Sequence, residues 1–228
     1  MLRIGHRGAK GYVAENTFKS IKKAIQLNVD GIEIDVFKCL SGQLVLSHDA
    51  DLERMTGKSG AIENLTLEEL DDYLINKEYK ICTLNEILEK IKDPLLINIE
   101  LKGSDTATTT SEIINDFLVK GTWNIEDFIV SSFNWFELEK FRFFEKDIPV
   151  GILVSKSMSI NEAIKFAKKI DAQAIHPNYE LLNEKTIRKI KNNGFKVYTW
   201  TVNDKNKIEY MKKLSVDGII SDYPDRIW

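Results

Sequence analysis

The most constraining feature of this 228-residue chain is the regular alternation of short apolar segments with amphipathic segments of helical length. Several apolar segments are almost continuous, as in 95–101 (Leu-Leu-Ile-Asn-Ile-Glu-Leu), which is typical of strands buried on both faces. Strands that alternate with helices pair in parallel, because each helix returns the chain to the same edge of the sheet. This many units in a chain of this length predicts an α/β fold, closed into a TIM (β/α)8 barrel.

The pattern gives nine candidate strands for eight barrel positions: 2–5, 30–36, 43–47, 95–101, 128–132, 150–154, 172–175, 196–201 and 217–222. The turn residues Ser41-Gly42 allow 30–36 and 43–47 to form a hairpin, which would place His48 opposite Asp35. Alternatively, 43–47 crosses over to become a separate parallel strand. Both interpretations bring His48 close to the acidic residues of 30–36.

The pattern loosens between about 51 and 81, where Gly57 and Gly60 mark turns and Thr66 to Glu69 form a capping box before a short helix. We therefore expect one barrel domain, 1–228, with a small insertion at about 51–81 after the second strand region. Two later helices are expected at 87–91, after a second capping box, and around 111–119.

Composition excludes several classes of function. The formal charge of −3 and a pI near 5.8 leave no basic surface for nucleic acid, and no apolar run approaches the ~18 residues of a membrane span. No export signal precedes the first strand, and Cys39 and Cys82 lack metal-ligand spacing. We therefore expect a cytoplasmic protein with free thiols, either a monomer or a homo-oligomer.

Unusual polar residues follow the predicted strands closely. They are His6 and Arg7, Glu33 and Asp35, His48, Glu100 and Lys102, His176, and Trp200 and Asn203. The carboxyl ends of parallel barrel strands converge on one mouth, where active sites of this fold lie. The sequence therefore predicts one shared functional site.

The residue types restrict the chemistry of that site. Glu33, Asp35 and Glu100 supply only oxygen ligands, which suits one divalent cation, Mg²⁺ or Ca²⁺, with Mn²⁺ as a further choice. Arg7 and Lys102 add fixed positive charge for an anionic substrate. Histidines at separate strand ends can exchange protons on either side of a phosphorus atom. Cleavage of a phosphodiester fits all of these features.

The ordered motifs resemble those of the glycerophosphodiester phosphodiesterase family over the whole chain. They are His6-Arg7-Gly8 with Glu15-Asn16, Glu33-x-Asp35, His48-Asp49, Glu100-x-Lys102, Ser131-Ser132-Phe133, Trp200-Thr201-Val202-Asn203 and Asp217 to Pro224. The resemblance is specific because of the order and spacing of the set. Ser221 stands where threonine is more usual in the family.

This resemblance implies hydrolysis of glycerophosphodiesters, which are small molecules, to sn-glycerol 3-phosphate and an alcohol. It implies His6 and His48 as the acid/base pair and Glu33, Asp35 and Glu100 as metal ligands. It also implies that Arg7 and Lys102 hold the phosphate. Glu15 is expected to bind the substrate as well, and Trp200 either stacks on the glycerol group, which we favour, or fills the top of the barrel. The family scheme is attack by a glycerol hydroxyl to form a cyclic phosphate, which water then opens. His176 either shapes the mouth or has a functional role.

Three competing functions follow from the same residues. A metal-dependent amidohydrolase needs a His-x-His pair on the first strand, which His6-Arg7-Gly8 lacks. A barrel kept only for binding would be favoured by loss of a histidine or a ligand carboxylate, and none is missing. The third alternative is lysophospholipase D-type cleavage of lysophospholipids on the same barrel, which requires an apolar groove. Phe133, Trp135 and Phe136 could contribute to such a groove, and the alternative for Trp135 and Phe136 is that they are core positions of a helix.

Overall fold

The computed structural model describes all residues from Met1 to Trp228, and its centre is a closed barrel of eight parallel strands. The strands are β1 (Leu2–His6), β2 (Gly31–Lys38), β4 (Leu96–Leu101), β5 (Phe128–Ser132), β6 (Val150–Val154), β7 (Ala174–Pro177), β8 (Lys196–Thr199) and β9 (Gly218–Ser221). Each pairs in parallel with the next, and pairing of β1 with both β2 and β9 closes the barrel. The predicted TIM-barrel fold is confirmed.

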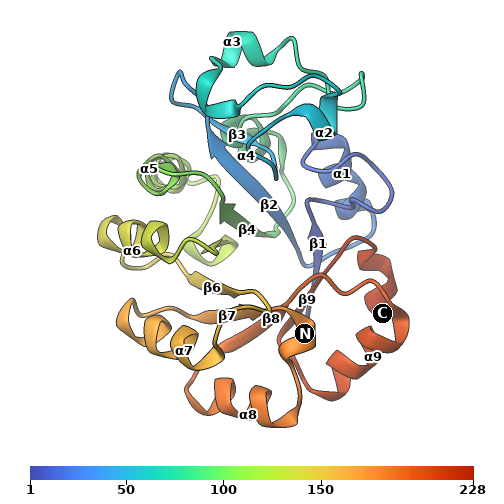
Figure 1. Ribbon diagram of the computed structural model, residues 1–228, viewed down its shortest axis with the longest axis vertical. Helices are drawn as coiled ribbons and strands as arrows, with labels where there is room; N and C mark the ends of the chain where they lie inside the picture. The colour runs from blue at the N-terminus through green and yellow to red at the C-terminus, as the bar shows by residue number, and fades with distance from the viewer.

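Helices surround the barrel as an outer ring (Figure 1). They are α1 (Phe18–Gln26), α4 (Leu84–Lys90), α5 (Thr106–Val119), α6 (Trp135–Phe144), α7 (Ile160–Lys169), α8 (Glu184–Asn192) and α9 (Lys205–Lys213). The expected start of α4 at residue 87 was wrong, because the capping-box residue Thr83 is followed at once by helix. The expected start of α5 near 111 was also wrong, since its threonine-rich first turn shows no apolar periodicity. No helix is long and apolar enough to cross a membrane.

The structure decides between the two interpretations of 43–47. Strand β3 (Leu44–Leu46) pairs antiparallel with β2, so the two form a hairpin. The register differs by one residue from the expected one: Ser47, whose N–H donates to the Asp35 carbonyl at 3.2 Å, lies opposite Asp35 in place of His48. The reason is a three-residue loop, 40–42, which centres the hairpin on Ser41.

The segment after the hairpin packs on the outside of the barrel, where Figure 1 shows it beyond the ring of helices, with α2 (Glu53–Thr56) and α3 (Leu67–Leu70). It has an apolar core of its own, formed with the outer face of the hairpin and separate from the main core between barrel and helices. Leu52, Ile62 and Leu70 are its most deeply buried side chains from the insertion. This core fixes the insertion beside the end of β3, from which His48 follows.

The barrel interior is apolar at its amino-terminal end, where Ile4, Ile129 and Tyr198 belong to one buried cluster. His176 lies above them, fully buried, with its ring 5.1 Å from the Tyr198 ring. Neither ring nitrogen has a hydrogen-bond partner, and burial lowers the pKa of His176 to about 3. The imidazole is therefore neutral and forms part of the packed barrel interior below the mouth.

Gly151 on β6 is required by this packing, because a Cβ at position 151 would overlap the His176 ring. We expect Gly151→Ala to destabilise the fold by about 1–3 kcal/mol through overpacking. In a chain of this length, that lowers the melting temperature by about 2–4 °C per kcal/mol. Adding His176→Ala should recover part of the loss, as thermal unfolding would show. An unchanged melting temperature in the single variant would contradict this packing.

Candidate active site

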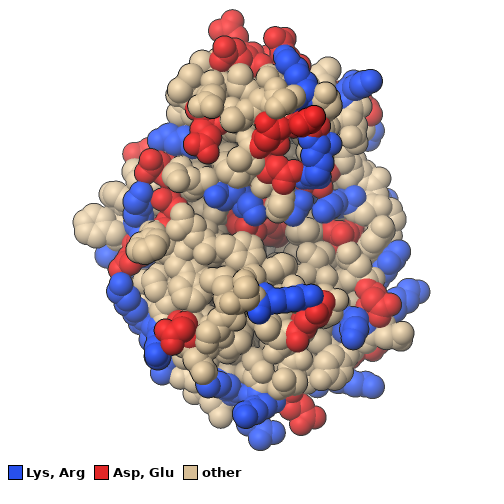
Figure 2. Space-filling model, viewed as in Figure 1, with Lys and Arg blue, Asp and Glu red and all other residues tan.

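A cavity of about 90 Å³ lies at the carboxyl ends of the barrel strands. All predicted site residues except Asp35 and Glu15 line it. Acidic and basic side chains also gather near the middle of the molecular face shown in Figure 2. One side of the cavity is apolar and aromatic, with Phe133, Leu153 and Trp200, and the opposite side carries the histidines and the charges.

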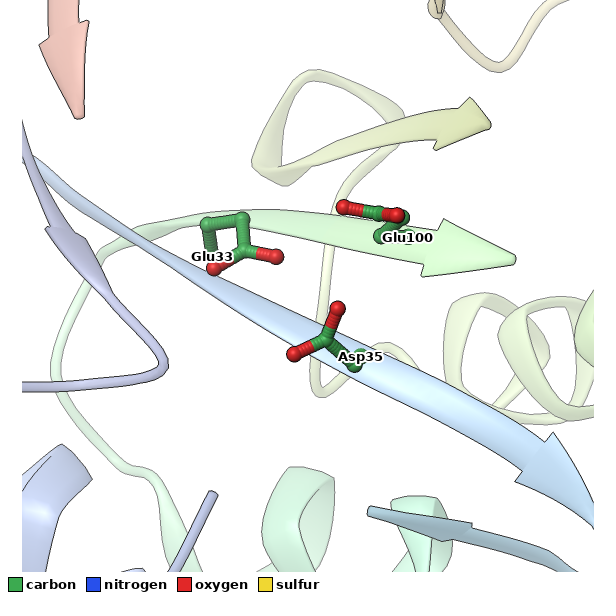
Figure 3. A group of neighbouring side chains, drawn as sticks. All are labelled: Glu33, Asp35 and Glu100. Atoms are coloured by element: carbon green, nitrogen blue, oxygen red, sulfur yellow. The ribbon is translucent and has the colours of Figure 1, made fainter. Parts of the chain in front are cut away.

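Three carboxylates meet at this end of the barrel because of strand register. Glu33 and Asp35 are two residues apart on β2 and therefore point to the same side, and Glu100 on β4 is the register partner of Asp35. Their carboxyl groups point toward one another (Figure 3), and one oxygen from each lies within 4.8 Å of the others. All three residues are buried.

The electrostatics of the triad fit a divalent cation. Burial and the neighbouring carboxylates raise the pKa of Glu33 well above its usual value, and burial and Asp35 raise the pKa of Glu100 to about 7. Glu33 Oε1 and Asp35 Oδ1 are buried without any hydrogen-bond donor. Converging, unsatisfied carboxylate oxygens are the donor set that Mg²⁺ and Ca²⁺ prefer.

Two cations flank the triad. Arg7 Nε is 3.1 Å from Asp35 Oδ2, and the Arg7 backbone N–H donates to Glu33 Oε2 at 3.0 Å. Lys102 Nζ is 2.9 Å from Glu100 Oε1 and 3.8 Å from Asp35 Oδ1. Arg7 has a positive φ of 51°, a conformation rare outside glycine that concentrates at functional sites. Both side chains line the cavity, where they could bind a phosphate group.

The His6 ring is held by a carboxylate at the end of β9. His6 Nδ1 lies 2.6 Å from Asp222 Oδ1, and Asn203 Nδ2 donates to Asp222 Oδ2 at 2.7 Å. Since an ionised carboxylate only accepts hydrogen bonds, Nδ1 of a neutral His6 carries the proton. Its Nε2 then has a free lone pair, directed toward the triad at 3.9 Å from Glu33 Oε2. Burial lowers the pKa of His6, while the Asp222 hydrogen bond works in the opposite direction.

His48 has a matching arrangement on the other side. Its Nδ1 lies 2.6 Å from Asp49 Oδ1, which leaves Nε2 as the free ring nitrogen. Burial lowers the pKa of His48, and the charge of Asp35 opposes that shift. The site thus has two imidazoles that are each held at Nδ1 by a carboxylate and can each accept or donate a proton at Nε2 near neutral pH.

Comparison with known proteins agrees with this chemistry. The model of the glycerophosphoryl diester phosphodiesterase family matches residues 6–226. The chain belongs to this family. Two relatives named glycerophosphodiester phosphodiesterase come from Caldanaerobacter subterraneus subsp. tengcongensis and Bacillus altitudinis. The first is 33% identical over 99% of this chain and 96% of the relative, and the second is 32% identical over 98% and 95%.

A solved structure gives the same fold. It is that of an Oleispira antarctica phosphodiesterase in complex with the product sn-glycerol-3-phosphate. It is 29% identical to this chain, has a TM-score of 0.88, and is matched over 98% of this chain and 94% of its own. The predicted family and its enzyme class, a phosphoric diester hydrolase on a TIM barrel, are confirmed.

Of the predicted substrate-binding residues, Trp200 lines the cavity and Glu15 does not. Trp200 lines the cavity, packs edge-on against Phe133 at 5.2 Å between ring centroids, and donates from Nε1 to the His176 carbonyl at 2.7 Å. Glu15 lies behind Arg7 and outside the cavity lining, with Oε1 2.7 Å from Arg7 Nη1. Glu15 therefore contacts a substrate-binding candidate, whereas Trp200 forms part of the cavity wall.

Sequence reasoning gave no role to several residues that hold the site together. Asp222 and Asn203 hold His6, Asp49 holds His48, and buried Asn16 donates to Asp35 Oδ2 at 2.9 Å. Asn203 was predicted at this end of the barrel without a role of its own, and Asp222 had the same signal, since the two residues follow the ends of β8 and β9. Arg54, which contacts Asp49 and Glu15, had no such signal because it lies in the insertion.

Proposed function

We propose that this protein hydrolyses glycerophosphodiesters to sn-glycerol 3-phosphate and an alcohol, with one divalent cation and with His6 and His48 as the acid/base pair. The observation that carries the proposal is the convergence on one cavity of a buried carboxylate triad and two carboxylate-held imidazoles. Hydrolysis of a phosphodiester requires positive charge that stabilises the phosphoryl oxygens, and it requires proton transfer at the attacking and the leaving oxygen.

Glu33, Asp35 and Glu100 would hold the cation. When bound, Mg²⁺ or Ca²⁺, or alternatively Mn²⁺, would supply Lewis-acid stabilisation of the charge that develops on the phosphoryl oxygens. Lys102 and Arg7 face the same cavity and are placed to bind the remaining phosphate oxygens. Burial alone would lower the pKa of Lys102, but Glu100 and Asp35 raise it, so its ammonium stays charged.

The histidines then divide the proton transfers. The Nε2 atom of one imidazole accepts the proton of the attacking hydroxyl, and the imidazolium of the other donates a proton to the leaving alkoxide. Asp222 and Asp49 stabilise the respective imidazolium forms and keep each Nδ1 protonated. Trp200 and Phe133 form the apolar wall against which the carbon atoms of the glycerol group would pack.

We also propose a cytoplasmic location. Cys39 and Cys82 are both free and buried, which supports folding in a reducing compartment.

The activity itself is tested with purified protein, excess Mg²⁺ or Ca²⁺, and a panel of glycerophosphodiesters with different head groups. We expect release of sn-glycerol 3-phosphate, detected with a coupled glycerol-3-phosphate dehydrogenase assay. Lysophosphatidylcholine serves as the comparison substrate, because it is the substrate class of the lysophospholipase D alternative. Higher kcat/KM on the lysophospholipid would replace the proposed substrate with the lysophospholipase D alternative, and no turnover of either would reject the proposal.

A further inference from the structure

The insertion contributes a charged side chain to the surroundings of the active site. Arg54 on α2 reaches from the insertion to two carboxylates that belong to the barrel mouth. Its Nε donates to Asp49 Oδ2, and its Nη2 donates to Glu15 Oε1 at 2.8 Å. The two carboxylates come from different loops, one after β3 and one after β1, and Arg54 joins them.

Each of these carboxylates in turn holds a predicted site residue. Asp49 Oδ1 contacts His48 Nδ1 at 2.6 Å, and Glu15 Oε1 also accepts from Arg7 Nη1 at 2.7 Å. Although burial opposes it, hydrogen bonding from Arg54 and the charge of Arg7 hold the pKa of Glu15 at about 2. A continuous series of charged contacts therefore runs from His48 through Arg54 to Arg7.

All three guanidinium nitrogens of Arg54 contact the carboxylates of Asp49 and Glu15. Nε and Nη2 make the two contacts above, and Nη1 lies 3.4 Å from the second oxygen of Glu15. The side chain is 48% exposed, yet it does not line the active-site cavity as Arg7 and Lys102 do. Arg54 thus faces the groups that hold the catalytic residues and does not face the substrate.

The position of Arg54 is fixed by the insertion's own core. Leu52, two residues before Arg54, is 1% exposed. The carbonyl of Met55, the residue after Arg54, accepts a hydrogen bond from the backbone N–H of Asn76 at 2.9 Å. The short helix ends at Gly57, which has a positive φ of 76°. The backbone that carries Arg54 is therefore tied to the rest of the insertion on both sides.

We propose that Arg54 is a positioning residue for the phosphodiesterase reaction: it fixes Asp49 so that His48 presents Nε2 to the substrate, and it fixes Glu15 so that Arg7 stays at the phosphate. The insertion is therefore a functional part of the catalytic site. The proposal rests on the proposed function of His48. Lysine cannot replace the planar fork of arginine, because a single ammonium does not hold two carboxylates in fixed orientations.

The test compares Arg54→Gln and Arg54→Lys with a matched control, Lys80→Gln. Lys80 forms a surface ion pair with Asp71 in the same insertion, at 2.8 Å, and contacts no site residue. With glycerophosphocholine and saturating Mg²⁺, we expect Arg54→Gln to lower kcat about tenfold, part of the 10²–10⁴-fold that an acid/base group supplies, with little change in KM. Lys80→Gln should match the wild type, and Arg54→Lys should recover little.

Two further measurements separate positioning from other roles. In a His48→Ala background, Arg54→Gln should lower kcat much less than it does in the wild type, because only the contact through Glu15 to Arg7 is left for Arg54 to hold. The proton NMR signal of His48 Nδ1–H should be the same in Lys80→Gln as in the wild type and should broaden in Arg54→Gln, whether or not substrate is turned over. A raised KM with unchanged kcat, full additivity with His48→Ala, or an unchanged NMR signal would overturn the proposal. Inactive wild type with the expected NMR change would reject only the proposed function.

Discussion

Replacing either His6 or His48 with alanine is expected to lower kcat for glycerophosphocholine by about 10²–10⁴-fold, the usual contribution of a general acid or base. The double variant should be little worse than either single variant, because the two imidazoles act in one proton-transfer scheme. Each imidazole makes one hydrogen bond, to Asp222 or to Asp49, and lies at the cavity, so the fold should survive. Stopped assays for sn-glycerol 3-phosphate and circular dichroism check both points.

The third histidine supplies the control. His176 is buried below the mouth, and its two ring nitrogens have no partners, so His176→Leu removes no hydrogen bond. We expect wild-type kcat for this variant. A loss of kcat as large as that of His6→Ala would mean that the catalytic pair is assigned wrongly.

Removing one carboxylate of the triad should have an effect of similar size. Because a bound cation supplies several kcal/mol of transition-state stabilisation, Asp35→Asn is expected to lower kcat by about 10³-fold. In wild type, Mg²⁺ at about 100 times its Kd should add about 2.7 kcal/mol of stability, or about 5–10 °C in melting temperature. In Asp35→Asn this shift should disappear, and a full shift would contradict the assigned ligands.

The same triad predicts how stability depends on pH in a chelating buffer. The pKa of Glu100 is raised from its ordinary 4.5 to about 7, so the unfolded chain releases this proton more readily than the folded one. Stability without metal should therefore fall as pH rises from about 4.5 to 7. Glu33→Gln should raise the melting temperature in chelator while it abolishes turnover, because glutamine is neutral in both the folded and the unfolded chain and so removes the free-energy cost of burying or protonating this carboxyl group.

The barrel could be predicted from the sequence because its signal is repeated in every unit. The sequence could not decide whether 43–47 forms a hairpin with 30–36 or a separate strand, because the segment is apolar enough for either. The register of the hairpin depended on whether its loop is centred on Ser41 or between Ser41 and Gly42. The start of α5 was missed because Thr106 to Thr110 show no helical periodicity.

Much of the site could also be predicted, since parallel strands bring their carboxyl ends together. The contacts between individual residues of the site could not be predicted. Asp222 holds His6 across 216 residues of sequence, and only closure of the barrel between β9 and β1 brings them together. Arg54 lies outside the repeating pattern, and its contacts depend on how the insertion packs against the loops after β1 and β3.

The measurement that tests the central claim most directly is the rate of sn-glycerol 3-phosphate release from glycerophosphocholine, first in EDTA and then with excess Mg²⁺ or Ca²⁺. It is made in parallel on wild type and on Asp35→Asn. We expect no turnover by either protein in EDTA and recovery by wild type alone when the cation is added. Equal rates for wild type with and without the chelator would contradict the assignment of Glu33, Asp35 and Glu100 as the cation site.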